Sequence, residues 1–287
     1  MKVNVAIVDA FVDGDTGGNP AGVVLDADHL SDKQKLCIAR EVGLSETAFV
    51  SQSNTADFKL DFYTPQKQIA HCGHATIAAF SLLSQLGLVQ GRNTSKETID
   101  GDRDIEVFGN FAYMEQTEPQ YRYLEHDKVD IFNSVGITEK QIISDPVIVN
   151  TGNSFLIFGV KSIKNLETII PDYTRIESIS EKYDLIGFYI YTLETNNTER
   201  DASTRMFAPR YGIEEEAATG MAAGPLACFF HDFMNLDKEK FHIEQGHTMQ
   251  PSSPSCIEVV LYREGQKIRR LKAGGIGKPS RYLEIEI

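Results

Sequence analysis

One glutamate stands out by its position in the chain. Glu46, in the string Leu44-Ser45-Glu46-Thr47, lies where a helix-like segment gives way to an apolar, strand-like one. A charge is unusual there unless it points into a polar cavity, and a carboxylate in such a cavity can accept and return a proton. The corresponding stretch of the second half, residues 184–189, has no glutamate at this place. The alternative is that Glu46 caps the helix or is a solvated ion.

Two strongly apolar segments, His74–Leu86 and Met221–Met234, are predicted to be buried helices, because apolar residues lie on nearly every side of each. Gly73 and Gly220 open them. The first N–H groups of a helix lack internal partners and its dipole is positive there, so two buried helix starts would attract a small anion, most simply a carboxylate. The alternative is that the chain's own loops cap both ends. Glu214-Glu215-Glu216 comes just before the second helix; three adjacent acids usually form a solvated loop, but one of them could cap the helix start or turn inward as a second acid.

Neither a metal centre nor a two-thiol racemase is favoured by the residues around His74. The pair His71 and His74 has a spacing that could bind a metal on one helical face, but Gly73 interrupts it and no further ligand set is visible, so we expect no metal. Cys72 beside a helix N-terminus could be a nucleophile. A two-thiol racemase would need a second cysteine at position 218 or 219, and neither is one. His247 and the Arg269–Arg270 pair carry no clear signal and are expected on the surface.

The secondary structure that must position these residues is predicted to be α+β and strand-rich, with few helices. Alternating apolar residues predict strands, and a serine before Asp32–Val42 with a glycine after it predicts a capped helix there. The alternating rows are Val3/Val5/Ile7, Phe58/Leu60/Phe62, Ile257/Val259/Leu261 and Leu283/Ile285/Ile287.

An internal repeat indicates that the chain is duplicated. Short strings of the first half return in the same order and at a similar offset in the second. These are Thr16–Val24 with Thr151–Phe158, Phe62–Pro65 with Met206–Pro209, and Cys72–Thr76 with Ala218–Ala222. Each half would then contain several strands and one strongly apolar helix.

Composition excludes several classes of protein. The net charge of −13 disfavours nucleic acid as a partner. No run of about 20 apolar residues is present, so we expect no membrane span. Four widely separated cysteines and a strand-like start without an apolar leader predict a cytoplasmic protein.

The ordered motifs resemble the phenazine biosynthesis-like (PhzF-like) family over almost the whole chain. They are Asp9-Ala10-Phe11, Gly18-Asn19-Pro20-Ala21, Leu44–Phe49, Cys72-Gly73-His74-Ala75-Thr76, Phe207-Ala208-Pro209, Ala218-Thr219-Gly220 and Glu244-Gln245-Gly246. The resemblance implies a diaminopimelate epimerase-like fold, with two pseudo-symmetric domains and the active site between them. Each domain would be a curled, mostly antiparallel sheet around a central apolar helix.

The same resemblance sets the expected domain boundaries. Its C-terminal strand returns to the first domain, so we expect an N-terminal domain of residues 1–118 plus 281–287. Residues 128–280 would form the C-terminal domain, and the polar, proline-containing segment 119–127 the linker.

The resemblance implies a cofactor-free isomerase that forms a homodimer. Glu46, His74 and Glu216 would be catalytic, with Glu46 as the acid/base, and Asn19, Gly73, Gly220 and Met221 would bind substrate. Glu216 stands where the family has Asp, and Met221 where it usually has Ser, which a thioether cannot replace as a hydrogen-bond donor.

The leading hypothesis is a proton shift or epimerisation on a small carboxylate-bearing metabolite. Two alternatives remain. The first is a small-molecule binding or regulatory protein that kept the fold without turnover. The observation that suggests it is Met221 in the place of the usual Ser. The second is a cysteine racemase that uses Cys72.

Overall fold

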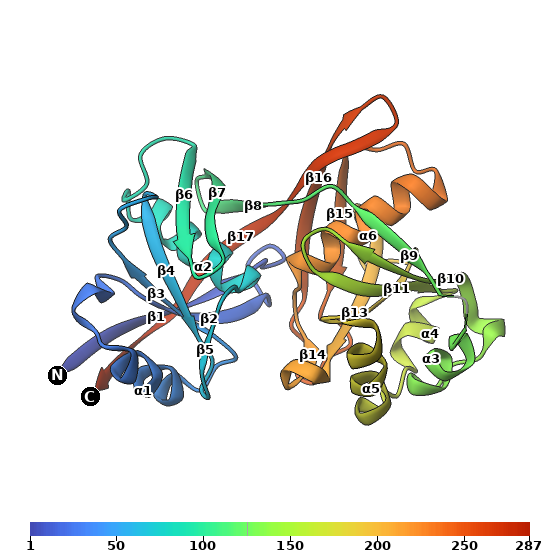
Figure 1. The fold of residues 1–287 in the computed structure, drawn as a ribbon, viewed down its shortest axis with the longest axis horizontal. Coiled ribbons are helices and arrows are strands. Elements are labelled where there is room, and N and C mark those ends of the chain that lie inside the picture. Colours follow the sequence, from blue (N-terminus) through green and yellow to red (C-terminus); the bar gives the residue numbers. More distant parts are fainter. Residues whose placement is uncertain (125) are drawn as a thin grey trace. The chain divides into compact units, whose positions relative to one another are not determined.

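A computed structural model describes residues 1–124 and 126–287. The chain divides into two compact units. Unit 1 comprises Met1–Glu115 together with Gly274–Ile287, and unit 2 comprises Gln116–Ala273. The two ends of the chain meet within unit 1, where the terminal ammonium group donates a hydrogen bond to the Ile287 carbonyl (Figure 1).

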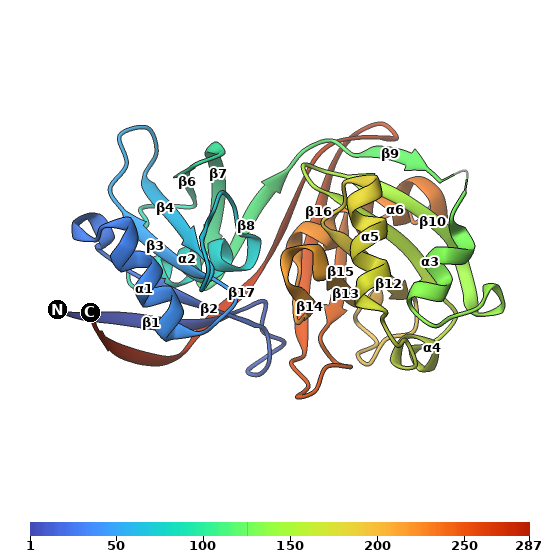
Figure 2. The same ribbon diagram turned by 60° about the horizontal axis from the view of Figure 1, so that its bottom comes forward.

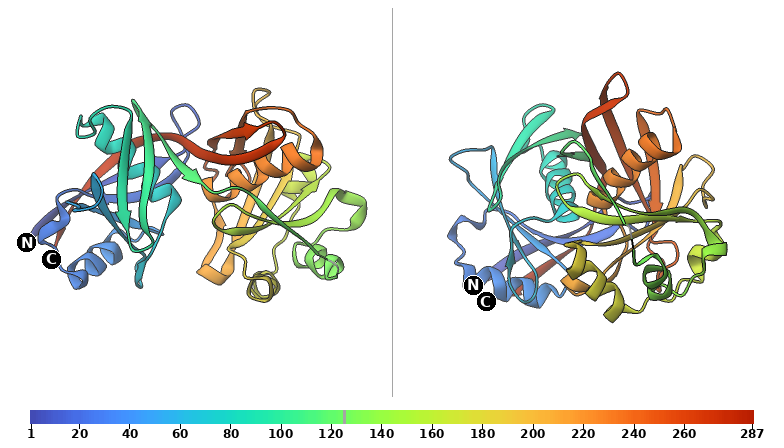
Figure 3. Two further views of the ribbon diagram at one scale, coloured as in Figure 1. Left: turned by 45° about the horizontal axis from the view of Figure 1, so that its top comes forward. Right: turned by 45° about the vertical axis from the view of Figure 1, so that its right-hand side comes forward.

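Unit 1 contains β1 (Lys2–Ala10), β2 (Asn19–Val24), η1 (Ala27–His29), α1 (Asp32–Val42), β3 (Thr47–Ser51), β4 (Phe58–Tyr63), β5 (Gln68–Ile69), α2 (Gly73–Gln85), β6 (Asn93–Thr98), β7 (Gly101–Phe108), β8 (Phe111–Gln116) and most of β17 (Lys267–Glu286). Its strand pairings run β1–β2–β3–β4–β6–β7–β8–β17 and return to β1, so the sheet closes on itself. The helix α2 packs against β1, β2, β3 and β7 (Figure 3). Every residue from Gly73 to Leu83 is buried.

Unit 2 contains β9 (Gln120–Tyr123), α3 (Lys128–Ser134), η2 (Glu139–Gln141), β10 (Ile142–Asn150), β11 (Ser154–Val160), α4 (Ile163–Glu167), α5 (Tyr173–Tyr183), β12 (Gly187–Thr192), β13 (Ala202–Ala208), η3 (Pro209–Tyr211), β14 (Ile213–Glu216), α6 (Gly220–Met234), β15 (Lys240–Gln245), β16 (Ser255–Glu264) and the first part of β17. An apolar cluster lies between α3, α5 and the strands β10–β13; it includes Ile131, Leu156, Ile176 and Phe188.

The order of strand pairings is the same in both units. In unit 1, β1–β2 is antiparallel, β2–β3 parallel across α1, β3–β4 antiparallel, β4–β6 parallel across α2, and β6–β7 antiparallel. In unit 2, β10–β11, β11–β12, β12–β13, β13–β15 and β15–β16 follow the same pattern, with α5 and α6 in the crossovers. In Figure 2, α1 and α5 lie on the outside of their units. The repeat predicted from short strings is therefore present in the hydrogen-bond ladders.

Three predicted helices are confirmed. The helix α1 has a capping box between Ser31 and Gln34 and ends at Gly43 in the left-handed conformation (φ 68°). The helices α2 and α6 each begin at the predicted glycine. The expectation of few helices was wrong for unit 2, where α3, α4 and α5 are also present. In α5, which Asp172 caps, Tyr173, Ile176, Ile179 and Tyr183 recur at helical spacing and pack in the apolar cluster of unit 2, so this helix could have been predicted.

Within the segment expected to be the linker, Gln120–Tyr123 forms β9 and pairs with β10. Glu125, inside that predicted linker, lies outside the described residues. The C-terminal return was predicted at residue 281, whereas unit 1 already includes Gly274, since β17 continues without interruption past that point. In the described part of the chain, no helix is long and apolar enough to cross a membrane.

We expect Gly22→Ala to destabilise unit 1 and disturb the segment next to Glu46. A Cβ at this position would lie 2.8 Å from Thr47 Oγ1 and 3.0 Å from Thr47 Cγ2, because β2 and β3 approach closely. Overpacking of this kind costs about 1–3 kcal/mol. Calorimetry of Gly22→Ala, Thr47→Ala and the double variant measures the coupling. Since Thr47 supplies the two nearest atoms, the double variant should recover most of the loss. Strictly additive losses would contradict this account.

Candidate active site

The chain places Glu46 at the junction of α1 and β3. Gly43 ends the helix, and the Glu46 carbonyl then accepts a hydrogen bond from the Gly22 backbone N–H at 3.1 Å. That bond continues the parallel pairing of β2 with β3. The Glu46 side chain is buried, with 6% of the residue exposed, so it is neither a solvated ion nor an exposed cap.

Cys72 and His74 come to the same carboxylate from the start of α2. Cys72 is the N-cap residue and His74 the second residue of the helix. His74 Nε2 lies 3.2 Å from Glu46 Oε2, and His74 Nδ1 lies 3.6 Å from Cys72 Sγ. The imidazole therefore lies between the carboxylate and the thiol, and all three residues are at most 6% exposed.

The Glu46 carboxylate has an acceptor position available. The contact with His74 is close enough for an ion pair but not aligned as a hydrogen bond, and Oε2 has no hydrogen-bond partner within the described residues. The first turn of α2 contains no acidic residue. Glu46 thus supplies the negative charge that the N-terminal helix dipole favours.

The donor atoms of Glu46, Cys72 and His74 lie within 4.8 Å of one another, a grouping that could hold a metal ion. The ring of His74 turns Nε2 toward the carboxylate and Nδ1 toward the thiol. A single ion bound by all three would require the ring to turn, because each imidazole nitrogen offers one lone pair in the ring plane. In its present orientation the cluster does not fit an ion bound by all three donors. The sequence-based expectation of a site without metal stays a prediction.

A buried lysine supports the start of α2 through a second set of contacts. Lys96 on β6 is fully buried; its Nζ donates to Thr76 Oγ1 at 2.6 Å and lies 3.4 Å from His71 Nδ1. Thr76 Oγ1 in turn donates to the Cys72 carbonyl at 2.6 Å. Nζ also lies 5.1 Å from the centre of the Phe62 ring. Burial lowers the pKa of Lys96 to about 7. None of the contacts named above supplies a negative charge to offset the cost of burying the ammonium group. Burial also lowers the pKa of His71 to about 2, so His71 stays neutral.

In unit 2, the start of α6 is fixed by Gln245. Its Oε1 accepts hydrogen bonds from the Thr219 N–H (3.2 Å) and from Tyr189 Oη (3.0 Å), and its Nε2 donates to the Glu216 carbonyl (2.6 Å). Thr219 Oγ1 donates to Glu216 Oε2 at 2.5 Å. The predicted second acid therefore lies half-buried beside the helix start and accepts a hydrogen bond there.

The predicted substrate-binding residues of unit 2 also have polar neighbours. Asn153 Nδ2 lies 3.5 Å from Met221 Sδ, so the thioether acts as an acceptor. Gln116 Nε2 donates to the Gly220 carbonyl at 2.9 Å. In unit 1, Asn19 is buried at the first position of β2.

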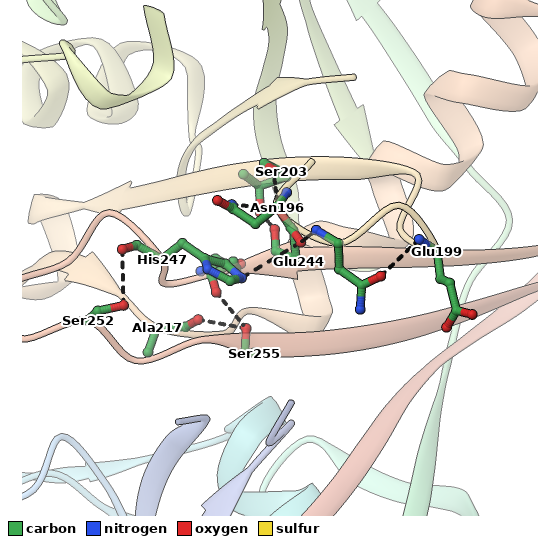
Figure 4. Close-up of polar contacts among 11 residues, drawn as sticks. Asn196, Glu199, Ser203, Ala217, Glu244, His247, Ser252 and Ser255 are labelled. Atoms are coloured by element: carbon green, nitrogen blue, oxygen red, sulfur yellow. Dashed lines mark hydrogen bonds and ion pairs between the residues drawn. The ribbon is translucent and has the colours of Figure 1, made fainter. Parts of the chain in front are cut away.

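Two further acids in unit 2 have structural partners. Glu215 forms a two-pronged ion pair with Arg205, at 2.8 and 2.7 Å. Glu244 is fully buried and accepts hydrogen bonds from both nitrogens of Asn196 and from Ser203 Oγ (Figure 4).

His247, expected on the surface, instead lines a cavity of about 100 Å³ with its Nε2 3.7 Å from Glu244 Oε2. Sequence gave no signal for this, since the pairing depends on the loop after β15.

The structure thus brings Glu46, Gly73 and His74 together in unit 1, and Glu216, Gly220 and Met221 together in unit 2. That the two helix starts converge on one ligand stays a prediction. Sequence reasoning missed Lys96 and Gln245. The motif containing Gln245 was visible, whereas Lys96 lies in a polar string, Ser95-Lys96-Glu97, typical of a solvated strand.

Comparison with known proteins decides the family. A family model described as phenazine biosynthesis-like protein matches residues 8–279. The chain belongs to this family. It is an isomerase, like relatives that align along nearly their whole length.

Two relatives and one solved structure illustrate the likeness. The "uncharacterized isomerase YfhB" of Bacillus subtilis (strain 168) is 30% identical, with 99% of each chain covered. The trans-2,3-dihydro-3-hydroxyanthranilate isomerase of Pseudomonas chlororaphis is 32% identical, with 94% of this chain and 95% of the relative covered. A phenazine biosynthesis protein of the PhzF family from Bacillus anthracis has 26% identity and a TM-score of 0.92, with both chains fully covered. The α+β, sheet-rich class predicted from sequence is thereby confirmed.

We expect Lys96→Met to flatten the pH dependence of stability in the alkaline range. The folded-state pKa of Lys96, about 7, lies below its usual value of 10.5, so the unfolded chain binds the extra proton between these values. This group therefore makes stability rise with pH from about 7 to about 10, by at most about 1.4 kcal/mol per pH unit. Calorimetry across this range should show a smaller slope for Lys96→Met than for wild type. The exposed Lys33 provides the control, because Lys33→Met should keep the wild-type slope. Equal slopes in all three proteins would refute the assignment.

Proposed function

We propose that this PhzF-like protein is a cofactor-independent isomerase that shifts a proton, or inverts a carbon centre, on a small carboxylate-bearing metabolite. Glu46 is the general acid/base. The observation that carries the proposal is the Glu46 carboxylate itself, which is 6% exposed and has an oxygen without a hydrogen-bond partner in the described residues. Buried polar atoms are rarely left unpaired, and the exceptions often serve function.

The proton transfer follows from the chemistry of this carboxylate. Ionised Glu46 accepts a proton from a carbon of the substrate, and the C–H electron pair moves into the substrate's conjugated system. The protonated Glu46 then returns the proton to another carbon. Inversion of a centre would instead need a second acid to deliver a proton to the opposite face of the same carbon, which is the role proposed for Glu216. His74 Nε2 and the dipole of α2 stabilise the carboxylate before and after the transfer.

The substrate class rests on the two helix starts and on a relative. Gly73 and Gly220 open buried helices, and backbone N–H groups at such places suit a carboxylate. The relative named trans-2,3-dihydro-3-hydroxyanthranilate isomerase takes its name from a carboxylate-bearing compound. Glu216, half-buried at the start of α6, is the proposed second acid, and Asn19 and Met221 are proposed to contact substrate.

A second candidate is a binding or regulatory protein without turnover. Met221 favours it, because its sulfur accepts a contact from Asn153 and offers no hydrogen-bond donor to a ligand. A screen of small carboxylates in D₂O separates the two candidates, with trans-2,3-dihydro-3-hydroxyanthranilate as the first compound. Deuterium incorporation by mass spectrometry supports the isomerase, and binding by calorimetry without any incorporation supports the second candidate.

We expect Glu46→Gln to abolish proton exchange while preserving the fold. The amide is nearly isosteric with the carboxylate but cannot accept and return a proton at neutral pH. The loss should be about 10²–10⁴-fold or more in the exchange rate of a compound that the wild type turns over.

Glu41 provides the matched control, since it lies exposed on α1 in the same unit. Glu41→Gln should exchange at the wild-type rate. Near-wild-type exchange by Glu46→Gln, or a collapse of its melting temperature with turnover intact, would show that Glu46 is structural.

A further inference from the structure

The thiol of Cys72 has no role in the proton transfer described above, yet it lies 3.6 Å from the imidazole that contacts Glu46. We propose that Cys72 is a positioning residue. Its S–H donates to Nδ1 of His74 and thereby keeps the ring proton on Nε2, which faces the Glu46 carboxylate. The inference rests on the proposed role of Glu46 as the acid/base.

The direction of both contacts follows from what each atom can offer. A neutral imidazole has one N–H donor and one acceptor nitrogen. A carboxylate oxygen is only an acceptor, so the 3.2 Å contact of His74 Nε2 with Glu46 Oε2, which is not aligned as a hydrogen bond, is electrostatically favourable when Nε2 carries the hydrogen. Nδ1 is then an acceptor and needs a donor. The Cys72 thiol, at hydrogen-bond distance for sulfur, is that donor.

The environment keeps the thiol protonated. Burial raises the pKa of Cys72, and the nearby Glu46 carboxylate acts in the same direction, while His74 acts against both. Two cationic side chains also act on this region: Lys96 interacts electrostatically with Cys72, and Arg103 with Lys96 and His71. A protonated, 5% exposed thiol is a poor nucleophile but remains a hydrogen-bond donor. These features disfavour the cysteine racemase considered from sequence.

The consequence for the site concerns the charge on Glu46. With hydrogen on Nε2, the imidazole presents a positive edge to the Glu46 carboxylate oxygen 3.2 Å away. In the other tautomer the Nε2 lone pair would face the carboxylate oxygen, and two acceptors would oppose each other. A thiol at Nδ1 thus selects the orientation that a general base at Glu46 requires.

The first test needs no variant. Nitrogen-15 NMR of the full-length protein labelled at histidine reports the tautomer of each ring. We expect His74 to be neutral with hydrogen on Nε2 at pH 7.5. A His74 ring with hydrogen on Nδ1 would overturn the proposal. This readout involves no substrate, so it can fail or succeed independently of the isomerase function.

The second test compares Cys72→Ala with Cys72→Ser. Alanine removes the donor, and we expect a mixture of tautomers and about a tenfold lower kcat with little change in KM. Serine restores a donor, so its tautomer should match wild type and its kcat should lie within about threefold. Cys228→Ala, in the interior of α6, controls for the loss of a buried thiol and should leave both readouts unchanged.

Thiol alkylation distinguishes positioning from nucleophilic chemistry. With iodoacetamide at pH 7.5 and peptide mapping, we expect the exposed Cys37 to react and Cys72 to stay unmodified in the folded protein. Faster labelling of Cys72 than of Cys37, or a Cys72→Ser variant as inactive as Glu46→Gln, would replace the positioning role with a nucleophilic one. A wild-type tautomer and kcat in Cys72→Ala would leave the thiol with no role.

Discussion

Removing a carboxylate from water is costly, and the interior of unit 1 is arranged around a carboxylate that is almost fully removed. Glu46 follows α1 on one segment, whereas the groups that stabilise it belong to the start of α2. Because α2 has no acidic residue of its own in its first turn, its dipole and the Glu46 charge complement each other. The closed sheet matters for chemistry since it brings these two distant segments together and excludes water from both.

The start of α2 is held by a polar chain as well as by apolar packing. Lys96 donates to Thr76, and Thr76 donates to the carbonyl of Cys72, whose side chain contacts His74. A fully buried amine without an anionic partner is unfavourable when protonated, and its lowered pKa of about 7 reduces that cost. Glu46 and Lys96, two of the buried ionisable groups of unit 1, thus each have a polar contact near the start of α2.

The features that could be predicted from the sequence are those that interactions between neighbouring residues determine. The capped helix α1, the all-apolar helices α2 and α6, and the alternating strands could be predicted because their patterns are complete within a few residues. Glu46 could be singled out because a charge between a helix and an apolar strand is unusual. The burial of Lys96 and the strand β9 could not, since both depend on partners far along the chain: Thr76 for the first and β10 for the second. The orientation of His74 between a thiol and a carboxylate likewise follows only from three-dimensional packing.

The two units share a frame but differ in what their carboxylates can do. The residue before β3 is Glu46, whereas the residue before β12, in the same place of the repeated pairing pattern, is the apolar Ile186. Unit 2 instead presents Glu216, whose Oε2 already accepts a hydrogen bond from Thr219 at 2.5 Å. The two carboxylates therefore differ in burial and in hydrogen bonding, and this difference supports the proposal that Glu46, rather than Glu216, is the acid/base.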